Sequence, residues 1–207
     1  MIIKSLFNNV TTPITKRHTQ QKILSGILPL HLFRIIQDVD KYKDFLPLCT
    51  YSNIQKTSIS HDGRTFDGKL QVGISPLFVE EYTSRVTVIP ETMTINANSI
   101  ESKLFDNLRS QWILQEHEEV VTKDTDTTEK ESCSSSSSRS SIIDSISCKV
   151  NFQVELTVSD PIIIGVLDQL LEQVGKKQVD AFEQRCHEIP IPTVVLDYYN
   201  NNRTASY

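Results

Sequence analysis

The histidines and carboxylates of this chain are spaced in ways that offer little to catalysis. Five histidines are scattered through 207 residues, and none shows the H-x-x-x-H spacing that places two metal ligands on one helix face. Glu80 and Glu81 are adjacent, so in a strand they point to opposite sides of the sheet and cannot form an acid–base pair. No G-x-S-x-G nucleophile elbow or glycine-rich phosphate loop occurs. We therefore expect no catalytic residue and no metal site.

Neutral hydroxyl side chains offer a different chemistry, the recognition of a polar group inside an apolar space. Tyr82, Ser84, Ser99 and Ser110 occupy positions that alternate in phase with apolar residues, which predicts that they share the inward face of a sheet. A hydroxyl can bond a ligand carbonyl, but it supplies no strong base. This pattern favours a binding protein over an enzyme.

One long helix, predicted from Pro161 to Glu188, would cover such a sheet. Its apolar residues gather on one arc: Ile163, Val166, Leu167, Leu170, Leu171, Val174, Ala181 and Phe182. Asp160 followed by proline is typical of a helix start, and the prolines after Glu188 end it. Gln178 and Arg185 interrupt the apolar arc. Either they bond the backbone and reach for solvent, or they line a cavity between helix and sheet.

Alternating segments before this helix predict strands. The clearest is residues 146–158, where apolar and polar residues alternate without a break, and weaker alternation runs through 66–74, 78–89, 93–99 and 105–115. The alternation implies one buried and one solvent-exposed face. Together with the short connections, this indicates an antiparallel sheet. Two short helices are expected after the first strand, one following Pro29 and one carrying Tyr42 and Phe45. The predicted class is α+β.

Composition narrows the class of partner. The net charge of −5 and pI near 5.5 argue against a nucleic-acid surface. Four cysteines show no zinc-type pair and favour a reducing compartment. No apolar run approaches the ~20 residues of a membrane-spanning helix.

Two segments have compositions unlike that of a folded core. Residues 118–145 are acidic and then serine-rich, which predicts a disordered insertion in a hairpin loop, either a plain linker or a phosphorylated regulatory loop. The first 37 residues contain no acidic residue but do contain lysine, arginine and hydroxylated residues. This is the composition of an organelle transit segment, although an incidentally basic N-terminus remains an alternative.

Four sequence stretches resemble the mitochondrial coenzyme Q-binding protein family, a START-like family. They are DVDKYKDFLPLC (38–49), LQVGISPLFVEEYTSRV (70–86), SKLFDNLRSQW (102–112) and VDAFEQRC (179–186). The resemblance implies a helix-grip fold over residues 19–189, in which a curved antiparallel sheet wraps a long C-terminal helix. Residues 1–18 would form an N-terminal extension and 190–207 a C-terminal tail. Leu48 departs from the family pattern, in which a tryptophan precedes the cysteine.

The same resemblance implies a function. Members hold ubiquinone (coenzyme Q) or related polyprenyl lipids as carriers or chaperones that support respiratory electron transport and ubiquinone biosynthesis. They act without a catalytic cofactor, in peripheral contact with the matrix face of the inner membrane and near quinone-biosynthesis or respiratory complexes. Because a polyprenyl tail exchanges one apolar medium for another, selectivity must come from a few hydrogen bonds to the ring, of about 1 kcal/mol each.

The ligand-binding residues expected from these patterns are Phe45, Leu70, Val72, Tyr82, Ser84, Ser110, Trp112, Val154, Leu167, Leu171, Val174, Gln178 and Phe182. Leu77 and Phe78 follow Pro76 and are expected to contact the membrane, the alternative being a hairpin turn with Phe78 under the sheet.

Two rival functions follow from related START-like proteins. One is an enzyme of the polyketide cyclase/dehydratase type acting on an aromatic ligand, for which Arg185 or Tyr82 would be the ionisable group. The other is a ribosome-associated toxin, which the acidic charge balance argues against.

Overall fold

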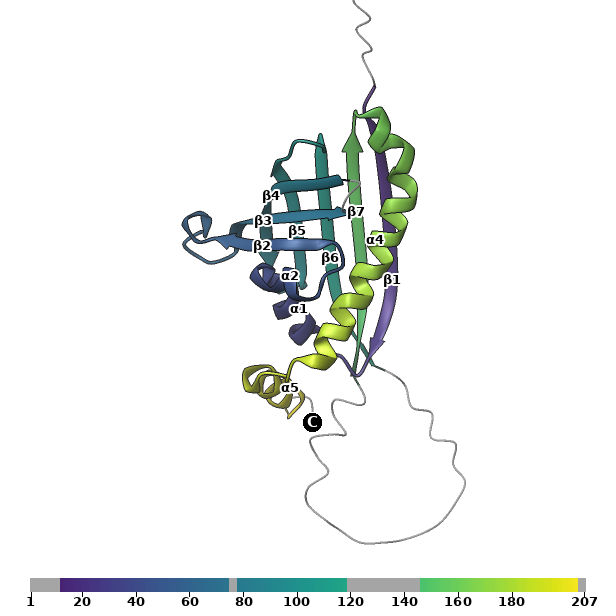
Figure 1. Ribbon diagram of the computed structural model, residues 1–207. Helices are drawn as coiled ribbons and strands as arrows, with labels where there is room; N and C mark the ends of the chain where they lie inside the picture. The colour runs from purple at the N-terminus through teal and green to yellow at the C-terminus, as the bar shows by residue number, and fades with distance from the viewer. Residues whose placement is uncertain (1–11, 75–77, 119–145, 205–207) are drawn as a thin grey trace, which may run out of the picture.

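Seven antiparallel strands form one curved sheet in the computed structural model, which describes residues 12–74, 78–118 and 146–204 (Figure 1). They are β1 (Ile14–Ser25), β2 (Cys49–Gln55), β3 (Thr65–Ile74), β4 (Phe78–Ile89), β5 (Thr94–Glu101), β6 (Asn107–Glu118) and β7 (Ile146–Val158). The strand order is β1-β7-β6-β5-β4-β3-β2, so each strand from β2 to β7 pairs with its neighbour in sequence, and β1 pairs with β7. This meander is the topology that the short connections predicted.

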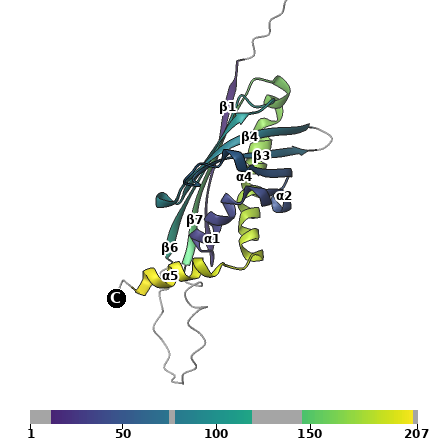
Figure 2. The same ribbon diagram turned by 90° about the vertical axis from the view of Figure 1, so that its left-hand side faces the viewer.

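Three of the described helices lie on one side of the sheet, and the last lies across its base (Figure 2). The helices are α1 (Pro29–Gln37), α2 (Tyr42–Phe45), α4 (Pro161–Glu188) and α5 (Thr193–Thr204), with 3₁₀ turns at Val39–Lys41, Lys56–Ser58 and Pro90–Thr92. Figure 2 shows α1, α2 and α4 together on the concave side. The predicted α+β class is confirmed, as are the long C-terminal helix and the two short helices after the first strand.

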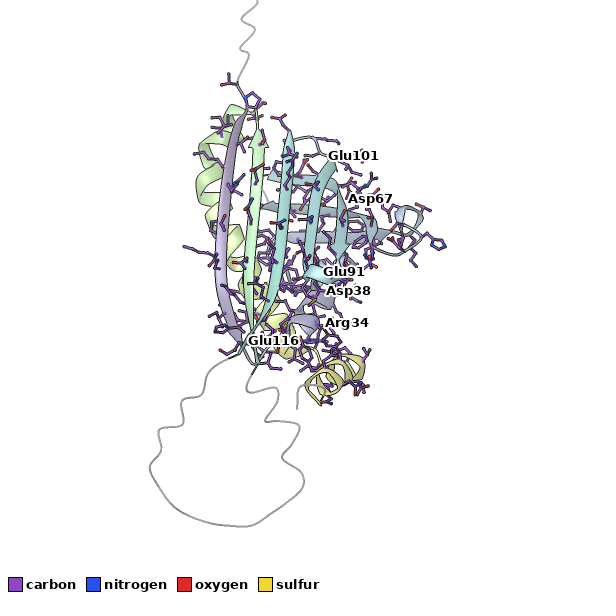
Figure 3. All side chains as sticks on the ribbon, turned by 180° about the vertical axis from the view of Figure 1, so that it is seen from behind. Arg34, Asp38, Asp67, Glu91, Glu101 and Glu116 are labelled. Carbon is purple, nitrogen blue, oxygen red and sulfur yellow. The ribbon has the colours of Figure 1, made fainter. Side chains whose placement is uncertain are left out.

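The opposite face of the sheet is polar. It is turned to the viewer in Figure 3, and cross-strand ion pairs lie on it. The Arg85 guanidinium bonds Asp67 at 2.9 and 3.1 Å, and Arg17 bonds Glu155 at 2.5 and 3.1 Å. One face is therefore apolar and covered by helices, while the other is solvated, as the alternation predicted.

Strand β1 is longer than the sequence suggested. It begins at Ile14 and pairs with β7 in an unbroken register from Ile14 with Val158 to Ser25 with Ser147. Residues 14–18 were expected in the N-terminal extension and are instead part of the sheet. Their alternation is hidden because the positions facing α4 are polar. Lys22, for example, bonds Asp180 at 2.7 Å and Glu183 at 2.6 Å on that helix.

Residues 190–207 were expected to form a tail, but most of them form helix α5. Val195 and Tyr199 are buried there against Leu28 and Ile146, in a second small apolar cluster. The Tyr199 hydroxyl accepts the backbone N–H of Leu30 at 3.2 Å, at the start of α1. The end of the chain is thereby tied to the base of the sheet.

Glycine allows the segment between α1 and α2 to approach the sheet closely. Val39 lies over Gly68 on β3, and a Cβ placed on that glycine would be 3.2 Å from Val39 Cγ1. The inward Gly68 thus leaves room for a residue that the helices present to the sheet.

Most of the serine-rich insertion lies outside the described residues. Glu118 and Ile146 flank it and pair with each other at the ends of β6 and β7, so the insertion does sit within a hairpin connection. No helix in the described part of the chain has the length and hydrophobicity needed to cross a bilayer.

Candidate ligand cavity

A cavity of about 190 Å³ lies between the concave face of the sheet, the α1–β2 segment and α4. Its walls are mainly apolar. Its lining residues are Ile36, Val39, Tyr42, Leu46, Pro47, Leu48, Cys49, Leu70, Val72, Gly73, Tyr82, Ser84, Val86, Ile95, Ala97, Phe105, Leu108, Ser110, Trp112, Val154, Leu156, Leu171 and Gln178.

The period-two geometry of the strands places most of these side chains. On β4 the lining residues are Tyr82, Ser84 and Val86, and on β6 they are Leu108, Ser110 and Trp112. Of the thirteen ligand-binding residues expected from the sequence, the cavity brings together Leu70, Val72, Tyr82, Ser84, Ser110, Trp112, Val154, Leu171 and Gln178.

Two expected residues pack beside the cavity instead. Phe182 is 1% exposed, and edge-to-face contacts with Tyr42, Phe45 and Trp112 surround it at centroid distances of 5.3, 5.1 and 5.0 Å. These contacts use the Phe45 and Phe182 rings to support the cavity wall. The side chains of Leu167, Val174, Leu77 and Phe78 lie outside the described residues.

Sequence reasoning missed two groups of lining residues. Val86, Ala97, Leu108 and Leu156 share the phase of the inward residues, so the alternation itself carried the signal. Residues 46–48, by contrast, form an irregular turn, and Cys49 begins β2 just before a shift in register, so no periodicity reveals the direction of these side chains.

The cavity reaches the surface near Leu48. This residue lines the cavity, is 37% exposed and has a φ of 67°, a left-handed conformation that is unfavourable for leucine. Its carbonyl accepts the N–H of Gly73 at 3.0 Å, and Gly73 pairs in turn with Val79, which is 54% exposed. Leu48, Gly73 and Val79 are called the rim below.

Four neutral polar side chains face the cavity: Tyr82, Ser84, Ser110 and Gln178. Within the described chain, none of the four makes a side-chain hydrogen bond. Other hydroxyl groups nearby do have hydrogen-bond partners. Ser99 accepts the N–H of Leu108 at 2.9 Å, and the Tyr42 hydroxyl donates to the Ile36 carbonyl. Ser84 is buried and the other three are half-buried, and all four open onto the cavity, where a polar ligand could supply their hydrogen-bond partners.

Residues 29–183 match the model of a protein family described as polyketide cyclase/dehydrase and lipid transport. The chain belongs to this family. Within it, the resemblance to the mitochondrial coenzyme Q-binding proteins is confirmed. Homolog B of Xenopus laevis is 32% identical over 110 residues, which are 51% of this chain and 42% of the relative. The protein of Schizosaccharomyces pombe is 30% identical over 88 residues, 42% of this chain and 52% of the relative. This chain therefore spans about half the length of these relatives.

Solved structures of similar fold confirm the START-like helix-grip architecture. A START superfamily protein from Mycobacterium smegmatis superposes with a TM-score of 0.60 at 13% identity, covering 84% of this chain and 99% of that one. An aromatase/cyclase from a Streptomyces species gives a TM-score of 0.56 at 12% identity, covering 85% and 94%. At such low identity the likeness concerns the fold alone.

The titratable groups that line the cavity of this family member are poor acids and bases. They are Tyr42, Cys49 and Tyr82. Burial raises the pKa of the Cys49 thiol to about 11 and raises the pKa of both tyrosines well above their usual value. None is matched to proton transfer near neutral pH.

Arg185, the other residue considered for catalysis, does not line the cavity. Its guanidinium lies 5.5 Å from the centre of the Phe45 ring and bonds Glu188 at 3.2 Å. Of the two interrupting residues on α4, Gln178 faces the cavity and Arg185 does not. The described residues contain no cluster of three or more histidine, cysteine or acidic side chains that could hold a metal.

Proposed function

We propose that this protein binds ubiquinone, with the quinone ring in the cavity, and carries it as a lipid chaperone without transforming it. The observation that carries the proposal is an apolar cavity in which four neutral polar side chains have no hydrogen-bond partner in the described chain, in a protein similar to coenzyme Q-binding proteins. An aromatic ring with carbonyl oxygens supplies both the apolar surface and the acceptors that such a cavity lacks.

The volume of the cavity is large enough for the quinone ring but not for the polyprenyl tail. An engineered cavity of about 150 Å³ is known to hold benzene, so about 190 Å³ suits a ring but not a long polyprenyl chain. The tail would leave over the rim, where Leu48 and Val79 offer exposed apolar surface. This arrangement lets a membrane keep hold of the tail while the protein takes the ring.

The cavity favours carriage over chemistry. An enzyme of the cyclase type needs an ionisable group in contact with its substrate, and the candidate Arg185 lies elsewhere, while burial keeps Tyr82 protonated. A neutral cavity instead binds the ring without moving protons to or from it.

The relatives are named mitochondrial, which supports a mitochondrial setting for this activity. We place the protein in mitochondria, in peripheral contact with the matrix face of the inner membrane. The rim, together with Leu77 and Phe78, would meet the bilayer there, and quinone-biosynthesis or respiratory complexes would receive the ligand. Related polyprenyl lipids with a similar ring would also be accepted.

The test is extraction of ligand from protein purified in a ubiquinone-producing host. Wild-type protein should yield ubiquinone at a substantial fraction of stoichiometry. Ala97→Phe fills the cavity with a larger side chain and should yield little, whereas Asn98→Ala, on the polar face one residue away, should match wild type. A lipid-free wild-type extract would contradict the proposal, as would equal loading of all three proteins.

A further inference from the structure

Two of the unpaired hydroxyls lie on strands that are not neighbours. Ser84 is on β4 and is only 4% exposed, and Ser110 is on β6; strand β5 runs between them. Both side chains line the cavity, and neither hydroxyl bonds to any residue in the described ranges. Both hydroxyls open onto the cavity, so a ligand that displaces water from it must replace the hydrogen bonds that the water would make to them.

The residue between the two serines leaves room for a flat group. Ser110 pairs with Ala97 on β5, and Ser84 pairs with Ser99, two residues further along the same strand. The Ser99 hydroxyl is already used by the backbone N–H of Leu108. Ala97 lines the cavity with a single methyl group, so a ring can lie against the sheet there and reach both free hydroxyls.

Strand spacing sets the separation of the two serines. Two strand intervals and a two-residue offset place their Cα atoms about 12 Å apart in a flat sheet, and concave curvature brings the side chains nearer. The pairing of β4 with β5 is irregular between Thr83 and Ser84, which adds a local bend at this position.

A para-quinone has dimensions that match this separation. Its two carbonyl oxygens are about 5 Å apart across the ring, and a hydrogen bond of about 2.8 Å at each end gives a span of up to about 11 Å. A lipid with a single polar head satisfies only one of the two hydroxyls and leaves the other buried and unpaired.

We propose that Ser84 and Ser110 form a clamp that bonds the two opposite oxygens of a para-quinone ring lying over Ala97. The clamp rests on the proposed function, and it deepens that function by stating what the cavity selects. The ligand class is a 1,4-dioxygenated ring, and ring lipids with one oxygen and prenyl alcohols are discriminated against. Discrimination arises because the site is built to pair two polar groups, which penalises any ligand that pairs only one.

The experiment is a binding titration with three probes on purified protein freed of lipid. The probes are ubiquinone with one isoprene unit, a prenylated phenol with one ring oxygen, and farnesol, which has no ring. The variants are Ser84→Ala, Ser110→Ala and the double variant. Ser99→Ala is the matched control, because it removes an inward hydroxyl of β5 that already has a partner.

Each single substitution should weaken quinone binding about fivefold and the double substitution about twenty-five-fold, as expected for two independent hydrogen bonds. Farnesol affinity should stay unchanged in every variant, which also shows that the cavity remains folded. The phenol should respond to one serine but not to both. Ser99→Ala should bind the quinone as wild type does.

Two outcomes separate the clamp from the function on which it rests. If wild-type protein binds the quinone and the double variant binds it equally well, the clamp is overturned and the carrier role stands. If wild-type protein binds farnesol but not the quinone, both fail. Loss of farnesol binding together with quinone binding would also overturn the clamp, because the serines would then be structural.

Discussion

The imidazole ring of His18 on β1 lies directly against the backbone of Gly175 on α4. A Cβ atom placed on Gly175 would overlap the ring, with His18 Nε2 at 2.7 Å. The first strand and the long helix therefore approach each other closely at a position where the helix has no side chain. This explains a glycine in the middle of a helix, where it normally costs about 1 kcal/mol relative to alanine.

We predict that Gly175→Ala destabilises the protein by about 1–3 kcal/mol, although alanine is the better helix former. In a chain of this size that corresponds to a fall in melting temperature of roughly 3–10 °C. The double variant His18→Ala, Gly175→Ala should regain stability relative to Gly175→Ala alone, since the ring that causes the overlap is gone. A Gly175→Ala protein that melts above wild type would show that the contact is not tight.

A buried histidine should make the protein sensitive to mild acid. His31 on α1 is 2% exposed, its Nε2 donates to the Cys186 carbonyl at 3.3 Å, and its Nδ1 is buried without a described partner. Burial lowers the pKa of His31 below 6.5, so the folded state keeps the ring neutral. The unfolded chain takes up a proton below pH about 6.5, which the folded chain resists.

Stability should therefore be complete above pH 6.5 and decline as the pH falls below it. At pH 5.5 the loss should reach at most about 1.4 kcal/mol, or a few degrees in melting temperature. His31→Gln cannot titrate, and its melting temperature should change less between pH 7.5 and 5.5 than that of wild type. Parallel pH profiles for the two proteins would assign the acid sensitivity to other groups.

The thiol in the cavity should react slowly and report occupancy. With a pKa of about 11, Cys49 is almost entirely protonated at neutral pH. N-ethylmaleimide should modify it about two orders of magnitude more slowly than an exposed cysteine, and a bound quinone should slow the reaction further. Peptide mass spectrometry of labelled protein measures both rates, with urea-unfolded protein as the fully reactive control. Labelling at an equal rate with and without quinone would place the ring away from Cys49.

The rim should matter for contact with membranes. The double variant Leu48→Ser, Val79→Ser removes the exposed side chain of Leu48, which lines the cavity, and that of Val79, which pairs with the lining residue Gly73. The partition coefficient for cardiolipin-containing phosphatidylcholine vesicles, measured by flotation, should fall by about thirtyfold, because each partly inserted side chain contributes on the order of 1 kcal/mol.

A matched control uses exposed apolar residues far from the opening. Ile59 and Val194 are 47% and 57% exposed, and Ile59→Ser, Val194→Ser should float as wild type does. Leu77→Ser, Phe78→Ser extends the test to the neighbouring residues predicted from the sequence. Equal losses of flotation in the rim and control variants would indicate nonspecific apolar binding to vesicles and no docking site at the rim.

The sequence predicted well those elements whose residue pattern reflects a single physical cause, such as a proline at a helix end or one face buried in the core. Helix α4 matches its predicted bounds because a proline begins it and prolines follow it. Strand β7 alternates cleanly because one face meets the core along its whole length. The inward serines could be named for the same reason, since strand phase fixes the face of every residue once one is known.

The sequence missed elements whose buried side contacts polar residues or residues far away in the chain. The inward side of β1 faces charged residues of α4, so Lys22 replaces an apolar residue and the period is lost. Helix α5 is rich in asparagine and tyrosine and becomes helical because Val195 and Tyr199 are buried by residues far away in sequence. The cavity rim depends on a left-handed Leu48, a backbone state that no side-chain pattern announces.

The pairing of β1 with β7 has a consequence for the order of events during synthesis. The hydroxyls of Thr15 and Thr157 meet at 2.9 Å across these strands, yet they are 142 positions apart in the chain. A ribosome adding roughly 5–20 residues per second releases β1 many seconds before β7 exists. During that interval β1 has no pairing strand, so its backbone N–H and C=O groups are exposed to other chains and to chaperones. The sheet can close only after residues 146–158 have been synthesised.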